Sequence, residues 1–506
     1  MRLLRRNALG VYAVYGAAIF SGLVVTPIVI RSLGKAGYGV WSFIGAVTIY
    51  LSLLDFGVGP AIVRFGAEAR GRRAPDELNE IASTGLVLYA VIGLVTLPVG
   101  AVLAWLVPWL AHVHSGHLVW DARISTFLIV LSLALRFPLG LFNNLLIAQQ
   151  RWDIQNLGNF LSTVLYAALV AVLMPHHGSL VLIGALTLGT TLLRLTFPLA
   201  WLRRELPGLR LRRRFVTRDG LRELTLFSSS NFLVQVSQKI VFSTDVIVVT
   251  LVLGSSRGGV YSVAAKLFAL AFGIGTAATS LMFPAFAELE GAAALERQRR
   301  LLLCGLRAGT ALMVVLALPM LLIPDLLIDA WIQRPGFGGS HSVMAILAAV
   351  LLIHQPVFVL TQFLIARARQ RAVAVASIAA TLANLVLSFA LAWAWGIDGV
   401  AVSTLLTDAL LLAWIVPRLA APAAGVSSAA IYRAIARPVV PALIAAALVF
   451  VGVARVLDPS RLVTLAPLGA LWAVVAAGML WQFGLAPDER ASLRGQLFRR
   501  ASATPA

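Results

Sequence analysis

Polar residues line one face of a long apolar stretch near residues 224–253. Six side chains there recur at steps of three or four, namely Ser228, Asn231, Gln235, Gln238, Phe242 and Asp245. Steps of this size place side chains on one face of a helix. Amides and hydroxyls on such a face can hydrogen-bond sugar hydroxyl groups in a cavity, or they can join two helices across a tight interface. We favour the cavity wall, because the stripe runs along most of the stretch.

Four cationic side chains lie inside apolar stretches, namely Arg136, Arg194, Lys239 and Lys266. A charge in hydrocarbon costs about 2.5 kcal/mol or more, so each of them needs a partner or a wet cavity. Arg136 and Lys239 are candidates to bind an anionic phosphate, which arginine can grip through two parallel hydrogen bonds. The alternatives are pairing or packing for Lys239 and, for Arg136, a backbone carbonyl freed by the nearby proline. Arg194 lies near the end of its stretch, where we expect its guanidinium to reach the membrane surface.

Asp245 and Asp408 are carboxylates inside apolar stretches of the predicted C-terminal lobe. Asp245 and Lys266 are expected at similar depths on consecutive antiparallel helices. We favour a structural ion pair between them, because buried charges normally pair, and contact of Lys266 with a substrate anion is the alternative. Asp408 is considered as a remote partner of Lys239.

The remaining ionisable candidates lie near the ends of apolar stretches or beside a proline. Arg31 and Arg64 are expected either to anchor helices at the membrane surface or to contact a substrate phosphate. Asp55 is expected to pair with Arg64, to cap a neighbouring helix, or to couple transport to a cation. His354 precedes Gln355-Pro356 and is expected to pack as a neutral side chain, with a proton relay as the alternative.

The composition indicates which kind of structural element holds these residues. Of 506 residues, 60% are hydrophobic and only 12% are charged, which excludes a soluble enzyme and a disordered chain. Apolar runs of about 20 residues, each long enough to cross a bilayer as a helix, recur along the chain. We therefore predict an all-α polytopic membrane protein. The fourteen predicted spans lie near 7–30, 38–62, 80–110, 123–148, 154–174, 179–202, 224–253, 259–288, 304–325, 342–366, 372–395, 397–417, 432–455 and 463–484.

The distribution of basic residues predicts the orientation of these spans. With the N-terminus and C-terminus in the cytoplasm, 30 of the 41 Lys and Arg residues fall in cytoplasmic segments and 7 in outer segments. Short cytoplasmic loops collect Lys and Arg, so this bias explains the net charge of +20 without nucleic acid as a partner. A single cysteine, Cys304, excludes an intramolecular disulfide. We expect no metal site and no cofactor, and no nucleotide-binding motif is present.

Two segments of the chain echo one another at an offset of 220 residues. Residues 33–42 and 253–262 share Leu, Gly, Gly, Val and Ser, with an aromatic residue in the same place. A repeat of this kind predicts two parallel six-helix lobes, an arrangement found in transporters. We expect an N-terminal lobe at 1–210, a C-terminal lobe at 211–420, and two further helices with a basic cytoplasmic tail at 421–506.

The same segments carry a family resemblance. Its residues, in chain order, are Leu33-Gly34 with Tyr38-Gly39, Leu54-Asp55-Phe56-Gly57, Asp245 with Leu253-Gly254 and Tyr261, and Pro284-Ala285-Phe286. Their order and spacing resemble the lipid-linked oligosaccharide flippases (Wzx-type polysaccharide biosynthesis proteins) of the MOP exporter superfamily.

The resemblance implies two lobes around a V-shaped cavity in the bacterial inner membrane. It implies transport of an undecaprenyl-pyrophosphate-linked oligosaccharide to the outer leaflet by alternating access. The product would serve O-antigen or exopolysaccharide synthesis, with a polysaccharide polymerase and export machinery as further partners.

Two other functions compete with this interpretation. A multidrug or cation antiporter of the same superfamily shares the two-lobed plan, but cationic substrates favour buried carboxylates and the first predicted span contains none. A membrane enzyme would need a large outer loop that carries catalytic groups, and the predicted outer loops are short. Cations inside the spans favour an anionic substrate instead.

Substitution of the buried cations tests this hypothesis. We expect Lys239→Ala or Arg136→Ala to abolish surface glycan while the protein stays in the membrane, because each change removes a charge that contacts the phosphate. Glycan staining and membrane immunoblots measure the two effects. Normal surface glycan in the double variant would exclude both residues from phosphate binding.

Overall fold

The structure is a computed structural model that describes residues 2–114, 116–226, 228, 244–279, 282–292, 294–454, 462–481 and 490. These residues are almost entirely helical and contain no β-strand. Ten helices among them are long and apolar enough to cross a membrane. The predicted all-α polytopic membrane fold is therefore confirmed, while the count of fourteen spans stays a prediction.

The chain divides into two compact units, Met1–Ser262 and Val263–Ala506. The division falls inside one helix, α9 (Ser255–Thr279). The lobe boundaries near 210 and 420 stay predictions.

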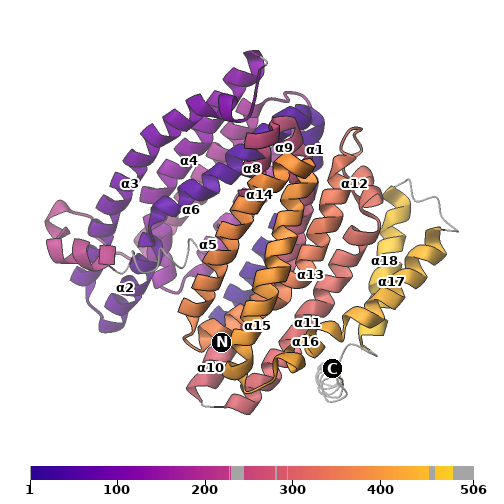
Figure 1. The fold of residues 1–506 in the computed structure, drawn as a ribbon. Helices are drawn as coiled ribbons and strands as arrows, with labels where there is room; N and C mark the ends of the chain where they lie inside the picture. Colours follow the sequence, from indigo (N-terminus) through magenta and orange to yellow (C-terminus); the bar gives the residue numbers. More distant parts are fainter. Residues whose placement is uncertain are drawn as a thin grey trace, which may run out of the picture. The chain divides into compact units, whose positions relative to one another are not determined.

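The first unit is a bundle in which α3, α4 and α6 run side by side, while α5 packs against α1 and α6 (Figure 1). Its elements, before the start of α9, are α1 (Arg2–Leu51), the 3-10 helix η1 (Ser52–Asp55), α2 (Val58–Arg72), α3 (Pro75–Leu110), α4 (Gly116–Ala148), α5 (Trp152–Leu173), α6 (Leu180–Glu205), the 3-10 turn η2 (Arg213–Phe215) and α8 (Thr244–Leu253).

Two backbone breaks divide the first 72 residues of this unit. Gly34, inside α1, has a φ of 72° and a ψ of −175°, a conformation essentially restricted to glycine, and it separates the first two predicted spans. The second break was not predicted. The span expected at 38–62 is interrupted after η1, where Phe56 and Gly57 take left-handed conformations with φ of 46° and 85°.

The second unit is built around α11 and α13, which pack against each other. After the end of α9, its elements are α10 (Met282–Gly291), α11 (Leu295–Leu322), α12 (Pro324–Ile332), α13 (Gly339–Ala366), α14 (Gln370–Thr407), the π-helical turn η3 (Asp408–Leu412), α15 (Ala413–Ala424), α16 (Ser428–Ala436), α17 (Val439–Ala454) and α18 (Leu462–Met479). Gly396, with a φ of 64°, separates two predicted spans inside α14.

Many large apolar side chains point outward from the helices, as expected for a protein surrounded by lipid. Trp105 and Trp109 of α3 are 66% and 76% exposed, and Trp393 of α14 is 79% exposed. These tryptophans lie close to the end of α3 and to the Gly396 break. Tryptophan concentrates at membrane–water interfaces, so these positions indicate where the helices leave the hydrocarbon.

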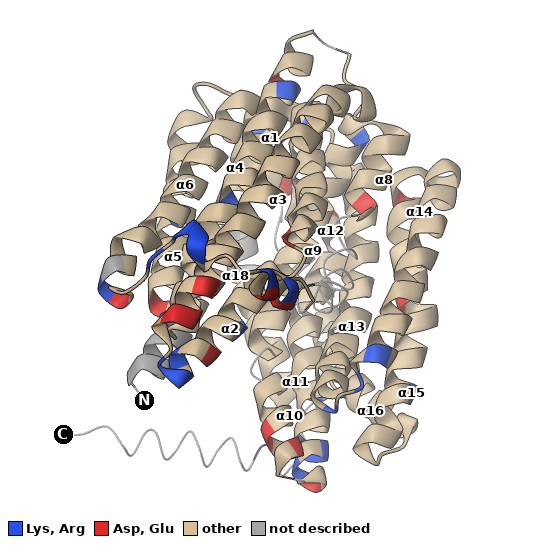
Figure 2. Ribbon diagram, turned by 90° about the vertical axis from the view of Figure 1, so that its left-hand side faces the viewer, with Lys and Arg blue, Asp and Glu red and all other residues tan. Residues whose placement is uncertain are grey.

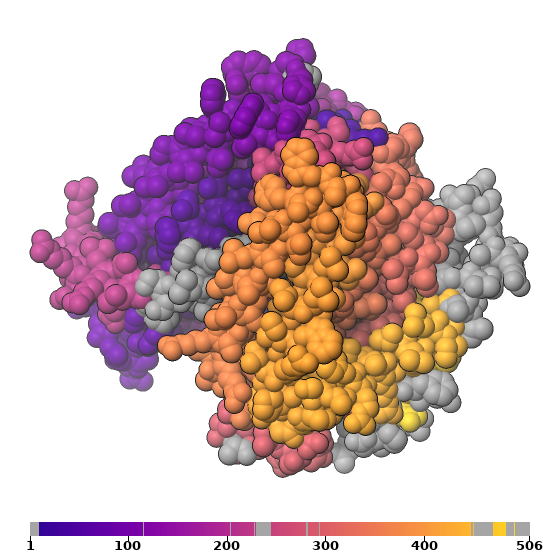
Figure 3. All heavy atoms as spheres, in the orientation of Figure 1, coloured from indigo at the N-terminus to yellow at the C-terminus, as the bar shows by residue number. Residues whose placement is uncertain are grey.

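Charged residues of the first unit gather mainly at helix ends (Figure 2). Arg151, in the α4–α5 turn, pairs with Glu205 at the end of α6. The following segment, 206–224, is tied to α3: Arg210 N donates to Asn79 Oδ1 (2.7 Å) and Arg212 N donates to Ser83 Oγ (3.3 Å). In the space-filling view this segment forms a projection at the edge of the unit (Figure 3). The end of α2, the start of α3, the α4–α5 turn and the end of α6 carry the arginines at 70–73, 151 and 204–222. We call this end of the unit the basic end.

The two echoing segments of the sequence meet inside the first unit. A Cβ atom added to Gly39 would lie 1.8 Å from the Ser255 carbonyl oxygen, and one added to Gly259 would lie 2.3 Å from that of Lys35. Gly39 and Gly259 are equivalent at the offset of 220. Gly34 and Gly254 are also equivalent, and both have positive φ, 72° and 83°. Positive φ angles at matching positions are what an internal repeat predicts.

This backbone contact predicts which glycines of α1 tolerate a methyl group. Gly39→Ala is expected to destabilise the protein by about 1–3 kcal/mol, because the added atom overlaps backbone atoms that cannot move aside. Gly45→Ala is the control, since a Cβ there meets nothing within 4 Å, and alanine favours the helix. Thermal unfolding in detergent measures both variants, and equal melting temperatures would contradict the contact.

Candidate functional site

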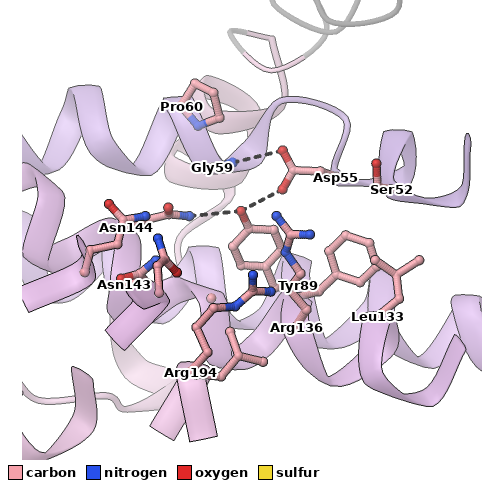
Figure 4. A pocket seen from close by; sticks show the side chains of 15 residues that line it. Ser52, Asp55, Gly59, Pro60, Tyr89, Leu133, Arg136, Asn143, Asn144 and Arg194 are labelled. Carbon is pink, nitrogen blue, oxygen red and sulfur yellow. Dashed lines mark hydrogen bonds between the residues drawn. The ribbon is translucent and has the colours of Figure 1, made fainter. Parts of the chain in front are cut away.

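A polar cavity of about 280 Å³ lies within the first unit (Figure 4). Its walls come from η1, α2, α3, α4, α5 and α6. Two of its residues, Asn143 and Asn144, lie within two turns of the end of α4, and Gln155 lies in the first turn of α5. The cavity is therefore closer to the basic end of the unit than to the opposite end.

Asp55 forms the centre of a hydrogen-bond network in one wall of the cavity. Tyr89 Oη donates to Asp55 Oδ1 (2.7 Å), and Gly59 N donates to Asp55 Oδ2 (3.4 Å). Asn144 Nδ2 in turn donates to Tyr89 Oη (3.2 Å). These bonds, drawn in Figure 4, connect α2, α3 and α4 through one carboxylate. Of the three expectations for Asp55, helix capping agrees with the bond from Gly59, because this N–H belongs to the first turn of α2.

The left-handed break explains how Asp55 reaches this place. Because the left-handed conformations of Phe56 and Gly57 interrupt the helix between η1 and α2, the Asp55 carboxylate can accept a hydrogen bond from the first turn of α2. Gly59 allows a close approach there, since a Cβ at this position would lie 3.0 Å from Tyr89 Oη and 3.2 Å from Asn144 Nδ2.

Arg136 of α4 and Arg194 of α6 supply two positive charges to the cavity. Their guanidinium groups face the Tyr89 side of it (Figure 4) and are close enough to repel each other. Within the described part of the chain, neither side chain has a hydrogen-bond or ion-pair partner. The two charges outweigh the single negative charge of Asp55, which is already bonded to Tyr89 and Gly59. The cavity therefore has the electrostatics of an anion site.

Three amide side chains line the cavity without partners among the described residues. Asn143 Oδ1 is buried and accepts no hydrogen bond there. Gln155 and Asn159 lie four residues apart on one face of α5, and neither side chain has a hydrogen-bond partner in the described part of the chain. Unpaired amides cost free energy in a membrane bundle, so these groups form a polar surface prepared for a hydrogen-bonding ligand.

The cavity gathers two of the predicted site residues, Arg136 and Asp55. Arg64 does not contribute to it, because this side chain pairs with Glu68 (3.0 Å) on the exposed face of α2. Arg31 lies exposed near the Gly34 break, outside the cavity lining. Four further predicted residues lie outside the described residues, namely Asn231, Gln235, Gln238 and Lys239.

Asp245 is buried at the start of α8, where Tyr261 Oη donates to its Oδ2 atom (2.9 Å). Tyr50 of α1 is hydrogen-bonded to the neighbouring Thr244. Asp245 therefore has a tyrosine as a partner in the first unit, which we did not predict. Lys266 lies on the part of α9 that belongs to the second unit, and its ion pair with Asp245 stays a prediction.

Asp408 lies in the second unit, where its partner is a histidine. His354 Nδ1 is 2.7 Å from Asp408 Oδ2, and Asp408 is 3% exposed. The Phe272 ring meets His354 edge-on, with 5.0 Å between ring centroids. The expectation that His354 only packs beside a proline kink misses this hydrogen bond, and the role of Asp408 as a remote partner of Lys239 stays a prediction.

Sequence reasoning missed several residues that line the cavity. Arg194 was expected to reach the membrane surface, but it faces Arg136 inside the unit. The sequence did contain a signal for Arg194, because it is one of only two arginines inside apolar stretches of the first half. Gln155 and Asn159 also carried a signal in their four-residue spacing. Tyr89 and Asn143 gave none, because one polar residue in an apolar helix has many structural uses.

The matching family model extends over residues 4–290 and is described as polysaccharide biosynthesis protein. It spans more than half of the chain and includes every residue that lines the cavity. The chain belongs to the polysaccharide biosynthesis protein family.

Several solved structures of transporters share the fold of this chain. The lipid II flippase MurJ, in an inward closed conformation, matches with a TM-score of 0.74 and 11% identity, over 94% of this chain and 98% of MurJ. An inward-facing multidrug resistance MATE transporter of the MOP superfamily matches with a TM-score of 0.67 and 15% identity, over 81% of this chain and 94% of that chain. A MOP superfamily transporter from Pyrococcus furiosus matches with a TM-score of 0.59 and 14% identity, over 84% of this chain and 95% of that chain. No curated protein sequence matches.

Family and fold together define the class of this polysaccharide biosynthesis protein. It is a multi-pass membrane protein of this family, and its fold is that of MOP superfamily transporters. The resemblance noted in the sequence is thereby confirmed at the level of the family, and the fold agrees with it.

The Asp55 network of this family member predicts the effect of removing one hydroxyl group. Tyr89→Phe is expected to destabilise the protein by about 1–3 kcal/mol, because Asp55 Oδ1 and Asn144 Nδ2 both lose their partner. Asp55→Asn should cost less in the Tyr89→Phe background than in the wild type, since the two groups form one bond. Additive effects in this thermal-unfolding cycle would contradict the network.

Proposed function

We propose that this protein is a flippase that moves an undecaprenyl-pyrophosphate-linked oligosaccharide from the cytoplasmic to the outer leaflet by alternating access. The observation that carries the proposal is the pair of guanidinium groups, Arg136 and Arg194, which share a cavity and have no partner among the described residues. Family membership supports a role in polysaccharide biosynthesis. A pyrophosphate is the part of such a substrate that needs two cations inside a membrane bundle.

The electrostatics of the cavity favour an anion over a cation. Two like charges held close together repel each other, and an anion between them removes the repulsion and satisfies their N–H donors. A cationic drug would face the same two charges, with Asp55 already hydrogen-bonded by Tyr89 and Gly59. The sign of the charge therefore disfavours the multidrug or cation antiporter, whose fold is otherwise the same.

The position of the cavity fits loading from the cytoplasm. It lies nearer to the basic end, which collects the arginines that the positive-inside rule assigns to the cytoplasmic side. In this orientation the protein occupies the bacterial inner membrane, with both termini in the cytoplasm. The product in the outer leaflet would then be taken up by a polysaccharide polymerase and the export machinery.

The membrane potential would assist outward transport of this substrate. A cell interior that is negative favours outward movement of an anion by about 2.3 kcal/mol per charge for each 100 mV. The arginines lower the cost of bringing the pyrophosphate into the low-dielectric bundle, and the potential supplies the direction. Neither contribution requires a bound cofactor.

Single arginine variants test the anion site. Arg136→Ala and Arg194→Ala are each expected to reduce pyrophosphate binding by the purified protein at least tenfold, since a charge-assisted hydrogen bond contributes about 1.5–3 kcal/mol. Arg204→Ala is the control, because Arg204 lies on the same helix as Arg194 but stacks on Trp201 outside the cavity. Equal affinity in the wild type and both cavity variants would exclude this anion site.

Deletion of the gene tests the function in the cell. Undecaprenyl-pyrophosphate oligosaccharide is expected to accumulate in the inner leaflet while surface glycan disappears, and mass spectrometry of the extracted carriers would identify the cargo. Plasmid-borne wild type and Arg204→Ala should restore the glycan, whereas Arg194→Ala should not. Unchanged carriers together with new sensitivity to cationic dyes would instead establish a drug exporter.

A further inference from the structure

A second cavity of the first unit, with a volume of about 260 Å³, has an acidic lining. It lies at the basic end, where α2, α3 and the helical segment 218–226 form its walls. Its charged residues are Glu68, Glu77, Glu80, Glu223 and Arg72. The whole chain contains 41 basic but only 21 acidic residues. An excess of carboxylates in one cavity at the basic end is therefore the reverse of what the composition predicts.

Only some of these carboxylates are neutralised by arginines. The ion pairs are Arg64 with Glu68 (3.0 Å) and Arg72 with Glu77 (3.4 Å). Glu80 accepts a hydrogen bond from the hydroxyl group of Thr217, which carries no charge. Neither Glu80 nor Glu223 has an ion-pair partner within the described part of the chain. Two negative charges of the cavity are thus left for a ligand to neutralise.

A buried hydroxyl group lines the same cavity. Thr84 lies one turn after Glu80 on the same face of α3 and is 0% exposed. Its Oγ1 atom has no hydrogen-bond partner among the described residues, whereas Thr96 of the same helix donates to the Ile92 carbonyl oxygen (2.7 Å). A Cβ atom added to Gly220 would lie 3.5 Å from Thr84 Oγ1 and 2.9 Å from Glu80 Oε1. An unpaired hydroxyl beside a carboxylate carries a desolvation cost that an N–H donor can remove.

The arrangement of these groups favours an organic cation over a metal ion. A divalent metal needs several ligand atoms at about 2–2.6 Å, and no three His, Cys, Asp or Glu side chains in the described ranges are grouped closely enough to hold one. An ammonium group has three N–H donors, which can reach acceptors on different walls. Phe65, Ile81 and Leu224 complete the lining with apolar surface. Such a surface suits methylene groups attached to the ammonium.

We propose that this cavity binds a small aliphatic amine, with the ammonium group between Glu80, Glu223 and Thr84 and the methylene chain against the apolar side chains. The amine would bridge the helical segment 218–226, which carries Glu223, to α3, which carries Glu80 and Thr84. Binding would therefore fasten this segment to the helices of the first unit. The inference does not depend on the proposed function, because this cavity shares no lining residue with the one that contains Arg136 and Arg194.

The test uses three soluble probes. Putrescine, 1,4-butanediol and magnesium chloride are each titrated by calorimetry into the purified full-length protein in phosphatidylcholine nanodiscs at constant ionic strength. Butanediol has the same chain length without the charges, and magnesium has the charge without the methylene groups. We expect saturable binding of putrescine and at least about tenfold weaker binding of the other two. Absence of putrescine binding, or equal binding of magnesium, would overturn the proposal.

Variants of the carboxylates locate the bound amine. Glu80→Gln should weaken putrescine about tenfold, because it removes the charge but keeps an oxygen that Thr217 can bond. Glu223→Gln should weaken it less, since Glu223 is exposed and water screens its charge. Asp76→Asn is the matched control, because Asp76 is an exposed carboxylate in the first turn of α3 outside the cavity lining. Unchanged affinity in Glu80→Gln, or an equal loss in Asp76→Asn, would overturn the site.

Thr84→Val separates a binding role of the hydroxyl group from a structural one. This change keeps the shape of the side chain and removes a buried group without a partner, so the unliganded variant should melt at the same or a higher temperature. Its affinity for putrescine should fall. A lower melting temperature together with unchanged affinity would make Thr84 a structural residue and overturn the site.

Hydrogen exchange tests the bridge between the walls. Saturating putrescine should slow amide exchange in residues 218–226 of the wild type, because the amine fastens this segment to α3. The same addition should have little effect in Glu80→Gln. Equal exchange with and without bound putrescine in the wild type would contradict the bridge.

Discussion

The site depends on one constraint, which is that a charge cannot remain unpaired in hydrocarbon without a large cost in free energy. Asp55 meets this constraint inside the protein through Tyr89 and Gly59. Asp408 meets it through His354, and Asp245 is bonded by Tyr261. Arg136 and Arg194 do not meet it with any described residue, and a cavity lies between their helices. This difference between the carboxylates and the two arginines supports the proposal that the arginines bind an anionic ligand.

The break after η1 shows how local backbone conformation serves this constraint. A continuous helix through residues 52–58 would carry Asp55 along one helical face, whereas the left-handed pair Phe56 and Gly57 turns the chain so that the carboxylate caps α2. Tyr89 and Asn144 then complete the network from α3 and α4. The wall opposite the arginines is thus fixed by hydrogen bonds and does not compete for their charges.

The helices could be predicted from the sequence more fully than the site. Apolar length placed the ends of α3 to α6 within seven residues, because the thickness of hydrocarbon sets the length of a spanning helix. The break at Phe56 escaped prediction although Asp55, Gly57, Gly59 and Pro60 lie around it, because the apolar run continues on both sides. Arg136 was identified because a charge in a span is rare. Arg194 was assigned to the membrane surface because its depth can be counted along the chain, whereas the face it presents depends on how α6 packs against α4.

The contact between Gly39 and Gly259 has a consequence for the origin of the chain. These two glycines occupy the same place in the two halves of the repeat, and their backbones touch each other. In an ancestor of half the length, one glycine would have made this contact with its own counterpart in a second copy of the same chain. A single codon would then have governed both sides of the interface. Gene duplication and fusion would have given each side its own codon, so that the two halves could diverge everywhere except where their backbones meet.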